Sequence, residues 1–120
     1  EYKTKHNARQ EYLAHNAIDN GAKIVIGHHP HVVEDTEIYS PKSCTQNSCA
    51  GFIAYSLGNF IFDQKYSEAP MQGMFLEITL NEDGSMTTKK NTVKLNKVFQ
   101  PDKIIKGKEE IIKFETPKIP

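Results

Sequence analysis

Three histidines lie within four positions of the chain, at His28, His29 and His31, and their spacing suits metal chemistry. A neutral imidazole binds divalent transition metals such as Zn, Fe or Mn without adding charge. The run from Ile24 to Ile26 and the glycine after it are typical of a buried strand that leads into a loop. If strand-like alternation continues, His29 and His31 share one side and His28 faces the other. We therefore predict His29 and His31 as metal ligands.

The histidine cluster also fits a solvated loop, or a His-rich tract without a fixed metal. Pro30 favours the metal interpretation because it fixes φ and stiffens the loop. The remaining histidines, His6 and His15, fall in a helical pattern, where we expect surface residues and not ligands.

A second polar motif spans residues 55–64 and reads Tyr-Ser-Leu-Gly-Asn-Phe-Ile-Phe-Asp-Gln. Asn59 can present a neutral amide to a cleft, and the Ser56 hydroxyl can bond a phosphate or carboxylate oxygen. We predict both as substrate-binding residues, although Asn59 fits equally well as a residue that closes a turn. Asp63 could hold a histidine tautomer beside a metal, but we favour a structural role for it.

Taken together and in this order, residues 21–32 and 55–64 closely resemble the capsule-synthesis CapA family. That family is linked to poly-γ-glutamate capsule formation and looks like a branch of the calcineurin-like metallophosphoesterases. Glu1 and Tyr2 resemble the end of a His-x-Gly-x-Glu-Tyr signature. A helix of the family that precedes the histidine strand is matched by Gln10, Ala14, Ile18 and Asp19. The resemblance covers roughly residues 1 to 80.

The resemblance implies an α/β fold, the C-terminal part of a four-layer α/β/β/α metallophosphoesterase-like sandwich. We expect residues 1–100 to form the C-terminal half of such a domain and residues 101–120 to form a tail. The family's other metal-binding motifs would precede Glu1, so we expect this chain to be the C-terminal portion of a longer protein.

The function implied by the resemblance is a role in capsule or poly-γ-glutamate biosynthesis at the cell surface. The site would be of dinuclear-metal hydrolase type, in which two divalent ions activate a water and His29 and His31 are the catalytic residues of this segment. Its partner would be an anionic cell-surface polymer or the machinery that makes it. The alternative is a non-catalytic accessory or binding segment, because catalytic zinc usually has three protein ligands. We expect this segment alone to be inactive.

Composition narrows the partners and the compartment. The 15 basic and 15 acidic residues cancel, which gives no electrostatic case for nucleic acid. No run approaches the ~20 apolar residues that span a bilayer, so we expect any membrane anchor to lie upstream. Cys44 and Cys49 flank a polar loop, and a disulfide between them would fit an extracytoplasmic location. Two free thiols or a thiolate metal site are the alternatives.

The hydrophobic pattern predicts one helix followed by strands. The helix is expected over residues 6–20, with Gly21 as its stop. A hairpin turn is expected at residues 81–84, which read Asn-Glu-Asp-Gly. A further short strand or helix is expected around Ile111 and Ile112. The main predicted strands cover residues 23–26, 32–39, 52–56, 74–80 and 86–95.

Overall fold

The computed structural model describes residues 1–44 and 49–113, and it begins with helix α1 (Ala8–Asp19). Asn7 caps this helix: its side chain accepts from the backbone N–H of Gln10, and the Gln10 side chain accepts from the backbone N–H of Asn7. Gly21 follows the helix with φ of 100°, a conformation that glycine adopts without strain. The predicted helix at residues 6–20 is thus present and slightly shorter.

The first sheet is three-stranded and has the order β1-β3-β2. Strands β1 (Ile24–Ile26) and β3 (Gly51–Ala54) are parallel, whereas β2 (Thr36–Tyr39) pairs with β3 in antiparallel fashion. We expected β1 to be buried, but it lies at the edge of this sheet and Ile26 is 41% exposed. β3 is central, and all four of its residues are buried.

The second sheet is built on a long hairpin. Strands β4 (Gln72–Leu80) and β5 (Met86–Leu95) pair in antiparallel fashion on either side of the predicted turn. The 3₁₀ helix η2 (Ala69–Met71) leads into β4, and Pro70 fixes φ in its first turn.

The residues that we expected to form a tail instead add two strands to this sheet. β6 (Pro101–Ile105) and β7 (Glu109–Ile112) lie end to end beside β5, with a break around Gly107. Only Ile112 of these two strands is buried, which explains why the hydrophobic pattern there is weak. The tail prediction is therefore corrected for residues 101–113, whereas the short strand expected around Ile111 and Ile112 is confirmed by β7. Residues 114–120 lie outside the described part.

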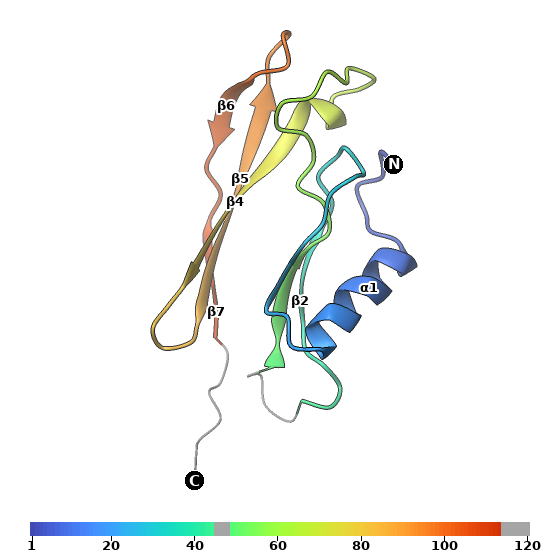
Figure 1. The fold of residues 1–120 in the computed structure, drawn as a ribbon. Helices are drawn as coiled ribbons and strands as arrows, with labels where there is room; N and C mark the ends of the chain where they lie inside the picture. The colour runs from blue at the N-terminus through green and yellow to red at the C-terminus, as the bar shows by residue number, and fades with distance from the viewer. Residues whose placement is uncertain (45–48, 114–120) are drawn as a thin grey trace.

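The helix and the two sheets form three layers, as Figure 1 shows. Between α1 and the first sheet the core contains Ala14, Ile18, Ile53 and Tyr55. Between the two sheets it contains Phe52, Ala54, Met86 and Ile112. β3 contributes to both cores because successive side chains of a strand point to opposite faces. The observed class is α/β, in an α/β/β arrangement.

Two further features are a disulfide beside the first sheet and the length of the helix. Cys44 and Cys49 form a disulfide with a Cα–Cα distance of 5.9 Å, just before β3 begins. Within residues 1–44 and 49–113, no helix is long and apolar enough to cross a membrane.

Candidate metal centre

The histidine loop leaves the carboxyl end of β1, next to the carboxyl end of its parallel neighbour β3. The loop backbone is not strand-like, because His29 has φ of 99° and His31 has φ of 61°. Both values lie in the left-handed region, which residues other than glycine rarely adopt. The alternation argument for these histidines was therefore wrong in its geometry, because the loop turns sharply here.

The turn nevertheless brings His29 and His31 together, and it adds a third residue that we did not predict. The ligand atoms of Glu1, His29 and His31 lie within 4.8 Å of one another. The Glu1 Oε1 atom is 3.8 Å from His29 Nε2. Glu1 is held there because the backbone N–H of Tyr2 donates to the Pro30 carbonyl at 2.9 Å. Sequence spacing gives no signal for a contact between residues so far apart.

Two imidazoles and a carboxylate are a suitable donor set for a divalent transition metal. Neighbouring ligand atoms in a tetrahedral zinc site lie about 3.4 Å apart, so the cluster would have to contract slightly around an ion. The His29 side chain is 79% exposed, which leaves it room to make that movement. A three-ligand set also leaves a coordination position open for water or substrate.

His31 is more firmly held than His29. Its ring lies between Tyr2 and Phe62, with centroid distances of 6.1 Å and 4.8 Å. Its Nδ1 atom is 3.0 Å from the Oδ1 atom of Asn59, which is only 5% exposed. The buried Asn59 side chain therefore contacts His31, one of the candidate ligands, directly.

The other predicted site residues lie in different settings. Ser56 is buried: its hydroxyl donates to the Val32 carbonyl at 2.7 Å and accepts from the Gly58 N–H at 3.2 Å. These bonds give Ser56 a structural role, holding the histidine loop to the end of β3, in place of the predicted substrate contact. Asp63 is exposed beyond the apolar run 60–62.

An open cavity of about 320 Å³ borders the two histidines of the cluster. His28 contributes to its wall together with His29 and His31, so His28 does not face entirely away as we expected. His28 nonetheless lies outside the three-ligand group. The rim is apolar, because Phe60, Ile61 and Phe62 are 52%, 71% and 44% exposed.

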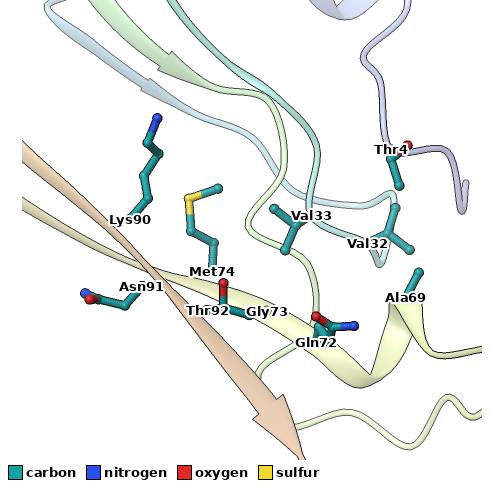
Figure 2. A pocket seen from close by; sticks show the side chains of 10 residues that line it. All are labelled: Thr4, Val32, Val33, Ala69, Gln72, Gly73, Met74, Lys90, Asn91 and Thr92. Atoms are coloured by element: carbon teal, nitrogen blue, oxygen red, sulfur yellow. The ribbon is translucent and has the colours of Figure 1, made fainter. Parts of the chain in front are cut away.

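A separate cavity of about 320 Å³ lies between strands β4 and β5 and the segment at Val32 and Val33, and it does not include the histidines. Figure 2 shows Lys90 and Met74 at one end and Thr4, Val32 and Ala69 at the other. The Lys90 ammonium donates to Thr36 Oγ1 at 3.2 Å and pairs with Glu110 at 3.4 Å. This cation is thus engaged within the fold, and the cavity shows no group arranged for catalysis among the described residues that line it.

His6 and His15 form a polar network between α1 and the first sheet. The His6 ring stacks on Tyr55 at 3.8 Å and bonds Asp35 at 2.9 Å, and the His15 ring bonds Glu37 at 3.0 Å. The Tyr55 hydroxyl donates to the same Glu37 at 2.6 Å. We expected these histidines on the helix surface and not among the ligands. They are partly buried side chains that tie the helix to the sheet.

The network shifts the pKa values of its members. Partial burial opposes ionisation of His6, but hydrogen bonds to Asp35 and Glu11 outweigh it, so the pKa of His6 is raised. Burial likewise acts to raise the pKa of Asp35 and of Glu37, but their hydrogen bonds lower both pKa values. Burial, followed by the hydrogen bond to Glu37, raises the pKa of Tyr55 far above its usual value.

This α/β arrangement, with histidines and a carboxylate at a sheet edge, defines a protein with a candidate metal centre. The family model of the bacterial capsule synthesis protein PGA_cap matches residues 1–64, which include every residue of the cluster. The chain belongs to this family of bacterial capsule synthesis proteins.

Two curated relatives support this assignment. The capsule biosynthesis protein CapA of Bacillus anthracis is 45% identical over 67 residues, which cover 56% of this chain and 14% of that protein. The PGA biosynthesis protein CapA of Bacillus subtilis (strain 168) is also 45% identical over 67 residues, or 15% of its length. The matched stretch is thus about one seventh of each relative. No solved structure matches this chain.

Proposed function

We propose that this chain supplies part of a divalent-metal centre in a CapA-like protein that acts in capsule or poly-γ-glutamate biosynthesis at the cell surface. The observation that carries the proposal is the convergence of Glu1, His29 and His31 within 4.8 Å. The names of the two Bacillus relatives support the link to capsule and PGA biosynthesis. A metal held here would act as a Lewis acid and lower the pKa of a bound water.

The fold supports a hydrolase-type site at this edge. Ligand-bearing loops at the carboxyl ends of parallel strands are the usual position for chemistry in α/β proteins. We propose that the three observed layers are part of a four-layer α/β/β/α sandwich, and that a second metal, if it is present, takes ligands from upstream of Glu1. The substrate would be an anionic polymer, and the ions Mn, Fe and Zn fit the donor set. An extracytoplasmic location, with any membrane anchor upstream, completes the proposal and agrees with the disulfide.

A non-catalytic accessory role is the second candidate. His29 is 79% exposed and Glu1 is 45% exposed, so the three ligands are only partly organised before an ion binds. A non-catalytic binding segment of the capsule machinery would not need these three side chains to be held in a fixed geometry. The two candidates differ in whether a longer chain that contains this one hydrolyses a phosphoester.

The test of the metal centre is titration of a longer protein that contains this chain with Zn²⁺ and Mn²⁺, followed by elemental analysis after dialysis; the chain alone should bind metal only weakly. His29→Ala and His31→Ala should each lower the bound metal, and Glu1→Gln should do so as well. His28→Ala is the matched control and should retain metal. Retention by His29→Ala, together with loss by His28→Ala, would overturn the proposed ligand set.

A further inference from the structure

The tautomer of neutral His31 decides which of its ring nitrogens can bind a metal. A neutral imidazole has one N–H and one nitrogen with a free lone pair, and only the second can coordinate an ion. The partner of the protonated nitrogen sets which tautomer is present. In His31 the Nδ1 atom contacts Asn59 Oδ1 at 3.0 Å.

The orientation of the Asn59 amide is fixed by a backbone group. Asn59 Nδ2 lies 3.0 Å from the Pro70 carbonyl oxygen, which can only accept a hydrogen bond. The amide nitrogen must therefore face Pro70, and the amide oxygen must face His31. Because an amide oxygen can only accept, His31 Nδ1 is the donor and His31 Nε2 has the lone pair.

The same amide begins a chain of contacts that reaches Tyr2, the residue that follows the third candidate ligand. Asn59 Nδ2 also donates to Gln64 Oε1 at 3.2 Å, and Gln64 Nε2 donates to the Tyr2 hydroxyl at 3.0 Å. The Tyr2 ring stacks on His31, and Tyr2 immediately follows Glu1. The four side chains thus form a closed ring of contacts around the histidine loop.

We infer that Asn59 is a positioning residue that holds His31 as the Nδ1–H tautomer, and that Gln64 and Tyr2 keep Glu1 beside the two histidines. The tautomer itself follows from hydrogen bonding alone. Only its consequence for metal binding rests on the proposed function. Residues that orient metal-binding histidines commonly change metal affinity 10- to 100-fold when removed, which sets the expected scale here.

The first measurement is the tautomer of His31 in the metal-free form of a longer protein that contains this chain. Long-range ¹H–¹⁵N correlation spectra, recorded at a pH where the ring is neutral, should show a protonated Nδ1 and an unprotonated Nε2. Asn59→Leu removes the acceptor and should shift His31 toward the Nε2–H form, whereas Asn59→Asp retains an acceptor and should preserve the tautomer. A wild-type His31 protonated on Nε2 would overturn the inference, whatever the variants do.

The second measurement is Zn²⁺ affinity by calorimetry. We expect Asn59→Leu to weaken binding at least about 10-fold, a change in the range of outer-shell substitutions. Gln64→Leu breaks the link to Tyr2 and should weaken binding several-fold. Gln64→Glu retains oxygens that accept from Asn59 and from the Tyr2 hydroxyl, so it should bind like wild type.

A stability control separates positioning from folding. Asn96→Leu removes an asparagine whose Oδ1 accepts from two backbone N–H groups in a distant turn. It should lower the melting temperature without changing either the His31 tautomer or Zn²⁺ affinity. If Asn96→Leu shifts the tautomer as Asn59→Leu does, the effect is unfolding and the inference fails. If His31 has the Nδ1–H tautomer but the protein does not bind Zn²⁺, the role of Asn59 is supported and the proposed metal centre is refuted.

Discussion

The contact between His6 and Asp35 should make the stability of the helix–sheet junction depend on pH. His6 Nδ1 lies 2.9 Å from Asp35 Oδ2, and the backbone N–H of His6 donates to Asp35 Oδ1 at 3.1 Å. A double-mutant cycle of His6→Ala and Asp35→Asn isolates the side-chain pair. Asparagine at position 35 retains an acceptor for the backbone N–H of His6, so this backbone hydrogen bond is present in all four proteins of the cycle and cancels.

The sign of the pH effect follows from the two pKa shifts. The pKa of His6 is raised above 6.5, so its contribution is complete below pH 6.5 and is lost as pH rises through the folded-state value. The pKa of Asp35 is lowered below 3.8, so its contribution is present above that pH and is lost as pH falls through its folded-state value. The pair therefore stabilises the fold most between these limits.

The expected magnitude is small because the pair is partly exposed. The side chains of His6 and Asp35 are 20% and 41% exposed, so solvent screens their attraction. Ion pairs of this kind contribute about 0.2–1 kcal/mol. We expect a coupling free energy of about 0.7 kcal/mol at pH 5.5, and about half of that at pH 9, where the neutral ring still donates a hydrogen bond. The His6 ring stacks on Tyr55 whether it is charged or neutral, so this contact cancels when the coupling free energies at the two pH values are compared.

Urea unfolding of a longer protein that contains this chain, followed by circular dichroism, measures the free energy of unfolding for each variant of the cycle. Cycles at the two pH values are compared at one ionic strength, since salt screens the pair. A coupling free energy that is equal at the two pH values, or larger at pH 9, would show that the charged form of His6 contributes nothing.

Three other outcomes follow from packing and covalent links. Ile18→Ala should lower the free energy of unfolding by about 3 kcal/mol in urea, since Ile18 is 2% exposed, whereas Leu13→Ala, at a residue 55% exposed, should cost under about 1 kcal/mol. Thiol titration of protein exported from cells should find no free thiol at Cys44 or Cys49, and reduction should lower stability by about 2 kcal/mol for so short a loop; two reactive thiols would contradict this. The chain alone should melt broadly at low temperature, because its radius of gyration of 16.0 Å exceeds the about 14 Å of a compact domain of this length. A sharp transition at high temperature would contradict that reasoning.

Local signals were sufficient to predict the helix and the hairpin. Apolar residues between positions 6 and 20 recur at helical spacing, and Gly21 supplies the stop, so the predicted helix limits were close to the observed ones. The run 74–80 alternates, and its turn contains Asn81 and Gly84, so both long strands were predicted. By contrast, β6 and β7 have mostly exposed residues, and their position depends on pairing with β5, which is not a local property.

The candidate site was predicted only in part, for a similar reason. His29 and His31 were chosen by residue type and spacing, and the structure brings them together through a turn instead of a strand. Glu1 joins them through the bond from Tyr2 to Pro30, a contact between segments far apart in the sequence. Asn59 was expected to face substrate or close a turn, and its contact with His31 depends on how two loops meet.

Two loops meet at this site because β1 and β3 are parallel neighbours, so both chains leave the sheet at the same edge. The approach is close: Gly27 N–H donates to the Ala54 carbonyl at 2.7 Å, and a Cβ on Gly27 would clash with the backbone carbonyl oxygen of Tyr55. Only glycine permits this approach.

Beyond Gly27, the loop adopts positive φ at both His29 and His31, which costs on the order of 1 kcal/mol or more at each non-glycine residue. Contacts from Tyr2 to Pro30 and from Ser56 to Val32 hold the loop in this unfavourable conformation. Backbone strain maintained in this way typically marks a functional site. The strain therefore supports the proposal that this loop presents the two histidines, together with Glu1, to a common ligand.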